Sequence, residues 1–454
     1  MDKILDYIAK NRERVVGELL ELISIPSISS DPAFSDAVFL AAEMVRERLG
    51  SAGLDSAVLI KTTGHPLVYA EKMVDSSRPT VLIYGHYDVQ PPDPLELWET
   101  PPFEPIIREG MIYGRGASDD KGQMYAHIKA AEYLLASGEL HCNLKFLIEG
   151  EEESGSVSLP DFIETHREML FADLALISDT AMLPDNIPAI TVGLRGLAAF
   201  EVTVRGPNRD LHSGIFGGAV SNPAVVLCQM IAALHDKDHL ITVPGLYDSV
   251  VELSVDERAE LGKVAMTADW YLKEVGVSDV VCETGYTPFE CTTIRPSLDV
   301  NGINSGYCGE GLKTVLPAVA SAKLSIRLVP NQKSELVSDQ LAVWLKQLAP
   351  AGVEVTVSKL YGGEPVHVPV DLPAYQAASQ AMSEVFGREP QPIRGGASIP
   401  VVALLERQLG LKTILLGFGQ DSDAIHSPNE HFGVENFLKG IMTSIRFLQK
   451  IMAS

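Results

Sequence analysis

Short apolar runs that end in ionisable residues recur through the first 180 residues of the chain. The clearest are residues 79–89 (PTVLIYGHYDV), 144–150 (LKFLIEG) and 173–179 (DLALISD). Segments with apolar residues at helical spacing separate them, such as GQMYAHIKAAEYLLAS from residue 122 onward. Strands that alternate with helices predict an α/β domain with a mainly parallel sheet and helices on both of its faces.

The pattern changes near residue 191, where apolar and polar residues begin to alternate. Residues 191–206, 321–330 and 353–360 show the alternation that is typical of strands with one exposed face. Helical segments at 222–236 and 334–349 lie between these strands. This block therefore predicts an α+β domain with a mostly antiparallel sheet.

The first pattern resumes near residue 375, with a helix, the strand TILLGFG and a closing helix from about residue 434. A chain of 454 residues is also too long for one ordinary core. We therefore predict one domain formed by residues 1–190 and 376–454, interrupted by an inserted domain of residues 191–375. The two linkers are expected to act as a hinge.

Charge and cysteine usage narrow the classes of partner. The chain has 60 acidic and 36 basic residues, a formal charge of -24, which repels nucleic acid and anionic membrane surfaces. Its first 29 residues mix charges with apolar residues at helical spacing, unlike a signal peptide or a membrane span. The five cysteines are scattered and lack CxxC spacing. We predict a cytoplasmic protein with reduced thiols and with no nucleic-acid or membrane partner.

Polar residues at the predicted strand ends are candidate metal ligands, because ligands of parallel sheets gather at the carboxyl ends of strands. His86 follows the run VLIY, and Asp88, two residues on, is placed to hold its second ring nitrogen. In GRGASDDKG, burial of the adjacent acids Asp119 and Asp120 implies a metal or a basic partner. Taken singly, a buried imidazole and a solvated helix cap remain open alternatives.

The segment EGEEESGS follows the next strand and contains four glutamates within five residues. Glu153 suits a metal ligand, while its neighbour Glu152 can take a proton from a metal-bound water and pass it to a leaving group. Asp179 ends DLALISD, and His426 lies in a loop after the strand TILLGFG. Alone, each is typical of an ordinary loop residue. Together these residues predict two divalent ions bridged by Asp119, with Zn²⁺ favoured and Mn²⁺ or Co²⁺ as alternatives.

In order and spacing, five motifs resemble one metallopeptidase family: GHYDVQP, GRGASDDKG, EGEEESGS, ISD and AIHSPNE. The family contains carnosinase-like cytosolic dipeptidases, aminoacylase, carboxypeptidase G and succinyl-diaminopimelate desuccinylase, and the dipeptidase branch is the nearest. The segments DLHSGIFGG, GEGLKTVLP, LSIRLVPNQ and IRGGASIP extend the resemblance over nearly the whole chain. It implies one ion bound by His86, Asp119 and Asp179, and a second bound by Asp119, Glu153 and His426.

The resemblance also implies catalytic roles. Glu152 becomes the general base that activates the metal-bridging water, Asp88 orients the first metal-ligating imidazole, and the Asp119–Asp120 peptide bond becomes cis. The inserted domain becomes a lid and a dimer surface. In the resulting homodimer, His212 of one subunit stabilises the oxyanion in the site of the other. A turn histidine that holds a Ser-Gly loop is the structural alternative for His212.

Four further residues are implied in substrate binding. Arg327 and Thr314 hold the terminal carboxylate of the substrate, and Ser398 and Gly396 line its pocket. An outward strand charge is the structural alternative for Arg327. Many cytosolic dipeptidases read REGGSIP where this chain reads IRGGASIP, so that Gly395 replaces an acid. This departure weakens the inference that a free substrate amine is recognised there.

The expected function is that of a metallopeptidase that hydrolyses the amide bond of dipeptides or short peptides. An N-acyl-amino-acid deacylase with the same two-metal mechanism is the first alternative, and its substrate is an N-acyl amino acid. A non-catalytic binding or assembly protein is the second. The intact set of Glu152, His212 and the five metal ligands argues against loss of catalysis.

Overall fold

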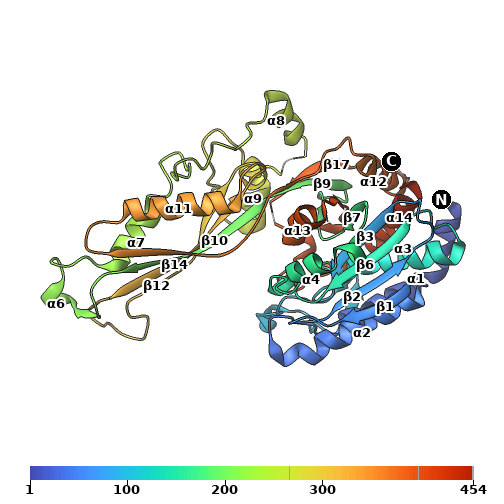
Figure 1. Cartoon of the computed structure of the whole chain (residues 1–454), viewed down its shortest axis with the longest axis horizontal. Helices are drawn as coiled ribbons and strands as arrows, with labels where there is room; N and C mark the ends of the chain where they lie inside the picture. Colours follow the sequence, from blue (N-terminus) through green and yellow to red (C-terminus); the bar gives the residue numbers. More distant parts are fainter. Residues whose placement is uncertain (265, 397, 452–454) are drawn as a thin grey trace. The chain divides into compact units, whose positions relative to one another are not determined.

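The computed structural model describes residues 1–264, 266–396 and 398–451, and the chain forms two compact units (Figure 1). Unit 1 comprises Met1–Val192, Val368–Ile393 and Leu404–Ser454, and unit 2 comprises Gly193–His367 and Arg394–Ala403. Residues 394–403 thus join unit 2, although the chain reaches them only after helix α12 (Pro373–Phe386) of unit 1.

Unit 1 is built on a mixed sheet in which the neighbours run β1-β2-β6-β3-β7-β18-β9. The four central strands, from β6 to β18, are parallel, and antiparallel strands flank them on both sides. Every residue of β3 and β6 is buried, as expected for parallel strands covered on both faces. The strands are β1 (Asp55–Ile60), β2 (Leu67–Lys72), β3 (Thr80–His86), β6 (Asn143–Glu149), β7 (Leu174–Ile177), β9 (Ala189–Leu194) and β18 (Lys412–Leu415).

Helices cover both faces of this sheet, which confirms the predicted α/β fold (Figure 1). Helix α3 packs against α1, α14 and strand β3, and it ends at Gly138, whose positive φ of 71° closes the helix. The helices are α1 (Asp2–Ile23), α2 (Ser35–Ser51), α3 (Lys121–Ser137), α4 (Leu159–Thr165), α5 (Arg167–Leu170), α12, α13 (Pro400–Leu409, which crosses into unit 1) and α14 (Val434–Lys450).

Smaller elements complete unit 1 and the points where the chain changes unit. One small sheet contains β4 (Ile106–Arg108), β5 (Met111–Tyr113) and β20 (His431–Gly433), and another contains β8 (Ala181–Met182) and β19 (Gly419–Gln420). Strands β16 (Val366–His367) and β17 (Gln391–Gly395) lie where the chain passes between the units. Short 3-10 helices are η1 (Pro32–Phe34), η2 (Leu95–Leu97), η3 (Glu152–Ser154) and η4 (Asp421–Asp423).

Unit 2 contains a four-stranded antiparallel sheet of order β12-β14-β10-β15, which confirms the predicted antiparallel sheet of the α+β block. Its strands are β10 (Gly196–Arg205), β12 (Ser297–Ser305), β14 (Val319–Leu328) and β15 (Glu354–Gly363), with the short pair β11 (Leu211–His212) and β13 (Val315–Leu316). Its helices are α6 (Ser213–Phe216), α7 (Pro223–Ala232), α8 (Val255–Gly262), α9 (Ala268–Val275), α10 (Pro288–Thr293) and α11 (Ser334–Leu348). The segment 191–206, predicted as one strand, is divided between β9 and β10.

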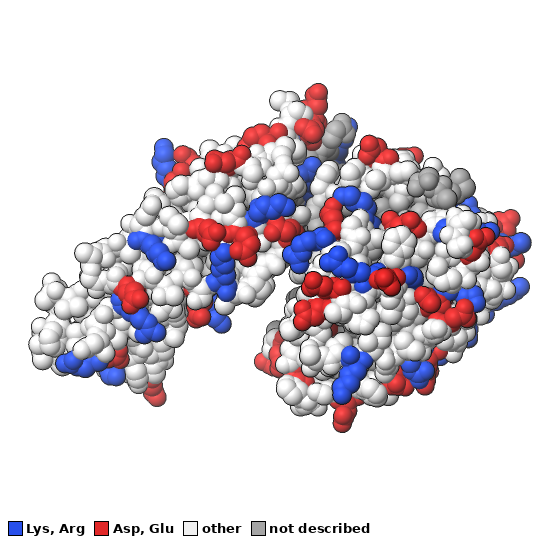
Figure 2. Space-filling view, viewed as in Figure 1, with Lys and Arg blue, Asp and Glu red and all other residues white. Residues whose placement is uncertain are grey.

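The core of unit 2 lies between its sheet and helices α7 and α11. Phe200, Leu324 and Leu341 are among its fully or almost fully buried members. Asn222 caps α7 by accepting a hydrogen bond from the Ala224 amide, and Pro223 occupies the first turn. On the face that Figure 2 shows, acidic and basic side chains are interspersed over both units. Among the described helices, none combines the length and the apolar character that a membrane crossing requires.

Truncation of Leu341 tests this core, because its side chain is fully buried between α11 and the sheet. We expect Leu341→Ala to lower the free energy of unfolding by about 2–5 kcal/mol, through lost burial and the cavity that remains. Val343 is 55% exposed on the same helix, so Val343→Ala serves as the control. Urea unfolding followed by circular dichroism measures both changes. Equal changes in the two variants would contradict the placement of this core.

Candidate metal centre

The candidate ligands lie where the central strands of unit 1 end. His86 is the last residue of β3, Glu153 lies in η3 after β6, and Asp179 follows β7. Because β6, β3 and β7 are parallel neighbours, their carboxyl ends meet at one edge of the sheet. Asp119 reaches this edge from the loop before α3, and His426 reaches it from the loop after β19.

Two groups of side chains share Asp119. Ligand atoms of His86, Asp119 and Asp179 all lie within 4.8 Å of one another, and so do those of Asp119, Glu153 and His426. The Nε2 atom of His86 lies 3.1 Å from Asp119 Oδ1, whereas Nε2 of His426 lies 2.9 Å from Asp119 Oδ2. Each oxygen of one carboxylate thus faces a different group. This is the arrangement that a carboxylate bridge between two ions requires.

The donor set fits divalent cations. Imidazole nitrogen mixed with carboxylate oxygen suits zinc, manganese and cobalt. The Nε2 atom of His86 is buried, lies 3.1 Å from Asp119 Oδ1 and has no hydrogen bond of good geometry among the described residues, as expected of an atom that binds an ion. Three closely packed carboxylates, those of Asp119, Glu153 and Asp179, repel one another unless cations lie between them.

Asp88 connects the two sides of the site. It is fully buried, and its two carboxylate oxygens accept hydrogen bonds from the amides of Glu152 and Glu153, at 3.3 and 3.1 Å. Nδ1 of His86 lies 3.1 Å from the carbonyl oxygen of Asp88 and 3.4 Å from its carboxylate. A single aspartate therefore holds both the first imidazole and the turn that carries the two glutamates.

Burial and crowded charge alter the acidity of these groups. Burial, opposed by His86 and reinforced by the charges of Asp179 and Glu153, raises the pKa of Glu152 to about 9. Burial and then the charge of Asp119 raise the pKa of Asp179 to about 7. Burial also raises the pKa of Asp119, but its contacts with His426 and His86 outweigh burial and lower it overall. Such acids are held ionised most readily by a nearby cation.

The loop before α3 has a special backbone. The Asp119–Asp120 peptide bond is cis, as the family resemblance implies. The side chain of Asp120 belongs to neither ligand group, and its Oδ2 accepts a hydrogen bond from the His86 amide at 3.2 Å. Gly122 follows, and a Cβ atom there would lie 2.1 Å from the carbonyl oxygen of Ala117. Only glycine fits this close approach.

The candidate residues of unit 2 form two pairs. His212 is exposed at the end of β11, where its Nδ1 accepts a hydrogen bond from the Gly214 amide, and the Ser213 amide donates to the carbonyl of Thr314 at 3.1 Å. His212 and Thr314 therefore lie on neighbouring segments of one small ladder. Arg327 lies elsewhere in the unit, on β14.

The second pair is joined by an arginine that the sequence reasoning missed. Nη1 of Arg327 donates to Ser398 Oγ at 3.0 Å, and Ser398 Oγ donates to the carbonyl of Arg195 at 2.6 Å. Nε of Arg195 donates in turn to the carbonyl of Gly396 at 2.9 Å. Burial and the nearby guanidinium of Arg327 lower the pKa of Arg195 to about 10. Its position as a lone arginine within the apolar run TVGLRGLAAF is the sequence signal that could have identified it.

The loop that carries Ser398 leaves no room for larger residues at Gly396. A Cβ atom there would lie 2.6 Å from the carbonyl oxygen of Thr292. Gly395, which stands where many cytosolic dipeptidases have an acid, ends strand β17. Ala397, the other departure from their REGGSIP motif, lies outside the described residues.

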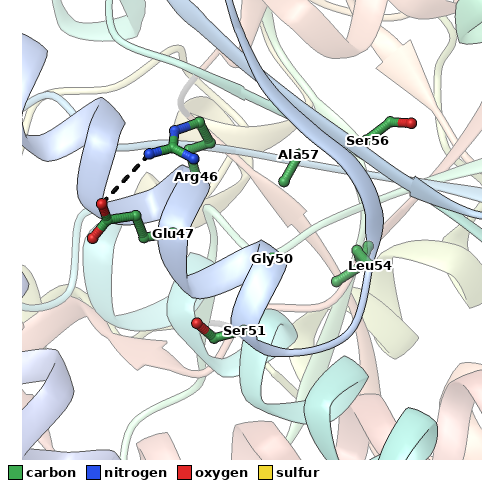
Figure 3. Close-up of a pocket in the computed structure, with 7 residues that line it drawn as sticks. All are labelled: Arg46, Glu47, Gly50, Ser51, Leu54, Ser56 and Ala57. Carbon is green, nitrogen blue, oxygen red and sulfur yellow. Dashed lines mark hydrogen bonds and ion pairs between the residues drawn. The ribbon is translucent and has the colours of Figure 1, made fainter.

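A separate hollow of about 640 Å³ lies at the end of α2 and the start of β1 (Figure 3). Its two charged side chains, Arg46 and Glu47, pair with each other at 3.4 Å. None of the candidate site residues lines it. The lining residues are Arg46, Glu47, Gly50, Ser51, Leu54, Ser56 and Ala57. Without a free charge or a candidate ligand, this hollow does not compete with the ligand groups of unit 1 as the reaction site.

The fold and the two ligand groups define a hydrolase of the two-metal class. The chain belongs to the peptidase family M20/M25/M40, whose pattern matches residues 82–450. The predicted membership of a metallopeptidase family is therefore confirmed.

Similar proteins are found among curated relatives and among solved structures. The Cys-Gly metallodipeptidase dug1 of Schizosaccharomyces pombe is 33% identical over 471 residues, which cover 99% of this chain and 98% of that protein. The Beta-Ala-His dipeptidase of Homo sapiens is 33% identical, with 97% of this chain and 90% of that protein covered. The structure of the M20 family metallo-carboxypeptidase Sso-CP2 from Sulfolobus solfataricus has a TM-score of 0.86 at 34% identity, covering 96% of this chain and 98% of that one.

Removal of divalent ions is expected to destabilise unit 1, because the carboxylates of Asp119, Glu153 and Asp179 then repel one another. With free Zn²⁺ at about 100 times its Kd, chelation should cost about 2.7 kcal/mol of unfolding free energy. Urea unfolding with and without chelator measures the difference. Asp119→Asn should abolish it, whereas the control Glu384→Gln, which alters a surface ion pair with Arg446, should keep it. If the unfolding free energy of the wild type were the same with and without chelator, the metal assignment would be ruled out.

Proposed function

We propose that the protein is a two-metal dipeptidase that hydrolyses the peptide bond of dipeptides or short peptides. The observation that carries the proposal is Asp119, shared by two ligand groups, with the partly buried acid Glu152 next to the ligand Glu153. The relatives named Cys-Gly metallodipeptidase and Beta-Ala-His dipeptidase, which align along almost their entire length, support the substrate class. Zn²⁺ is the ion that we propose, and Mn²⁺ and Co²⁺ suit the same donors.

The proposed mechanism assigns proton transfer to Glu152. Two divalent ions, when bound, polarise the scissile carbonyl and make water acidic enough to attack at neutral pH. Their charge also favours the ionised form of Glu152, whose pKa is otherwise raised by burial. The Glu152 carboxylate then accepts a proton from the attacking water and delivers it to the leaving amine. Asp88 keeps Glu152 in place through the Glu152 amide.

Replacement of the general base separates chemistry from metal binding. We expect Glu152→Gln to lower kcat by at least about 100-fold on a dipeptide panel, because the proton acceptor is lost. Metal content and unfolding free energy should change little. Glu164→Gln, on the exposed face of α4, is the matched control and should keep wild-type kcat. A Glu152→Gln enzyme within tenfold of the wild type would show that another group takes the proton.

Substrate recognition is assigned to unit 2. Arg327 has a hydroxyl, Ser398 Oγ, as its hydrogen-bond partner among the described residues. Its planar guanidinium therefore has further donors for the terminal carboxylate of a dipeptide. The backbone at Gly396 belongs to the same proposed set, and Thr314, which lies beside His212, would join it from the partner subunit. This assignment accounts for a substrate with a free carboxyl end.

We further propose that residues 191–375 form a lid and dimerisation domain and that the enzyme is a homodimer. Apolar side chains are exposed around His212: Ile215 on α6 is 70% exposed, and Leu312, in the loop that leads to β13, is 90% exposed. Exposed apolar surface of this kind favours contact with a second copy. His212, itself exposed, is then available to the site of the partner.

The free thiols support a cytoplasmic location. All five cysteines are unpaired, and Cys142 is buried whereas Cys228 and Cys308 are exposed. Chains that keep exposed thiols without disulfides are typical of reducing compartments.

Mixed dimers test whether His212 acts across an interface. Alone, His212→Ala should lower kcat by about 100-fold or more, the usual effect of losing an oxyanion donor. When this variant is unfolded and refolded with Glu152→Gln, a heterodimer contains one site with both residues. Activity should return to about a quarter of the wild-type value, because half of the random dimers have one complete site of two. No recovery would contradict the trans arrangement, and Ile215→Lys should prevent recovery by weakening the dimer.

A further inference from the structure

Glu430 is a fully buried carboxylate that is not a candidate ligand of either ion. Its Oε2 accepts hydrogen bonds from Arg115 Nη1 at 2.8 Å and from the Gly116 amide at 2.9 Å. Its Oε1 accepts hydrogen bonds from the amides of Ser118 and Asp119, at 3.0 and 3.1 Å. Each oxygen of Glu430 thus accepts two hydrogen bonds. One of the four donors is the backbone amide of the shared ligand Asp119.

Glu430 also ends the loop that carries His426. At the start of that loop, Asp423 Oδ2 accepts hydrogen bonds from Ser118 Oγ at 2.8 Å and from the Gln420 amide at 2.9 Å. The loop of His426 is therefore tied to the loop of Asp119 on both sides of the histidine. The side chain of His426 is 53% exposed, so little packing holds it in place.

The two ligand groups depend on these ties to different degrees. His86 is the last residue of β3 and pairs with Glu149 of β6, and Asp179 lies two residues after β7; neither is a hydrogen-bond partner of Glu430 among the described residues. Asp119 and His426 both lie in loops, and Glu430 contacts the first loop and is part of the second. Loss of Glu430 should therefore loosen the group of Asp119, Glu153 and His426 more than the other.

We infer that Glu430 is a positioning residue that sets the affinity of the metal site formed by Asp119, Glu153 and His426. The inference rests on the two-metal site of the proposed function. Charge-assisted hydrogen bonds to backbone amides are strong and directional, so they fix the Asp119 backbone. Outer partners of metal ligands typically change metal affinity 10- to 100-fold when they are lost.

Glu430→Gln is the decisive variant, because it keeps the size of the side chain but replaces one double acceptor with an NH₂ donor that faces two other donors. Equilibrium dialysis against Co²⁺, followed by visible absorption, counts the ions and their affinities. The wild type is expected to bind two ions per chain. In the variant, the ion of the group that contains His426 should bind about 10- to 100-fold more weakly, and the other ion, which shares Asp119, should lose clearly less affinity. Excess Co²⁺ should restore kcat, which a merely structural defect would not allow.

Glu18→Gln is the matched control. Glu18 is a largely buried carboxylate of unit 1 that accepts hydrogen bonds from Lys129 and Tyr125, in a network that contains no candidate ligand. Its variant should lose stability but keep both Co²⁺ affinities.

If Glu430→Gln does not fold, Glu430→Asp replaces it, because it keeps the charge beside Arg115 but withdraws the shorter carboxylate from the amides of Ser118 and Asp119. A second ion that binds more weakly in Glu430→Asp then supports the inference, and unchanged affinities overturn it. A folded Glu430→Gln with two wild-type affinities likewise overturns it while leaving the proposed function intact. A wild-type chain that binds fewer than two ions would instead overturn the proposed function.

Discussion

Repulsion between like charges at one edge of a sheet is the constraint on which the rest of unit 1 depends. Asp119, Glu153 and Asp179 are brought together by parallel strands, and within the described residues no lysine or arginine forms an ion pair with them. The basic side chains that lie against these acids in the described part of the chain are the imidazoles of His86 and His426, and Gln90 donates a hydrogen bond to Glu153. The fold therefore stores an unfavourable arrangement of charge that divalent cations relieve, and the surrounding hydrogen bonds of Asp88 and Glu430 keep the carboxylates from moving apart.

The sequence indicated the sheet of unit 1 because parallel strands covered on both faces are uninterrupted apolar runs. β3 and β7 are such strands, β6 departs from the pattern at Lys145, and a polar residue of the candidate site lies at or soon after the end of each strand. Edge strands carry a weaker pattern. Strand β12 reads SLDVNGINS and is largely exposed. Its polar residues and glycine are uncommon in strands, so the sequence pattern did not predict it.

The residues that sequence reasoning missed are those whose role depends on contacts across long stretches of chain. Glu430 lies in a motif that was identified for its histidine, and its donors lie more than 300 residues earlier. Arg195 interrupts what was predicted as one strand, and its hydrogen bonds reach Gly396 and Ser398. No local periodicity records such pairings, because they arise only when distant loops meet in the folded chain.

The assignment of residues 394–403 to unit 2 bears on how this enzyme type can diversify. The chain passes from one unit to the other four times, so unit 2 is not one continuous insertion. A recombination event that exchanged only residues 193–367 would transfer Arg327 but leave its partner Ser398 with the recipient. Under the proposed function, substrate preference is thus inherited from two separate segments of the gene. Changes in the two segments must then remain compatible for the proposed carboxylate pocket to survive.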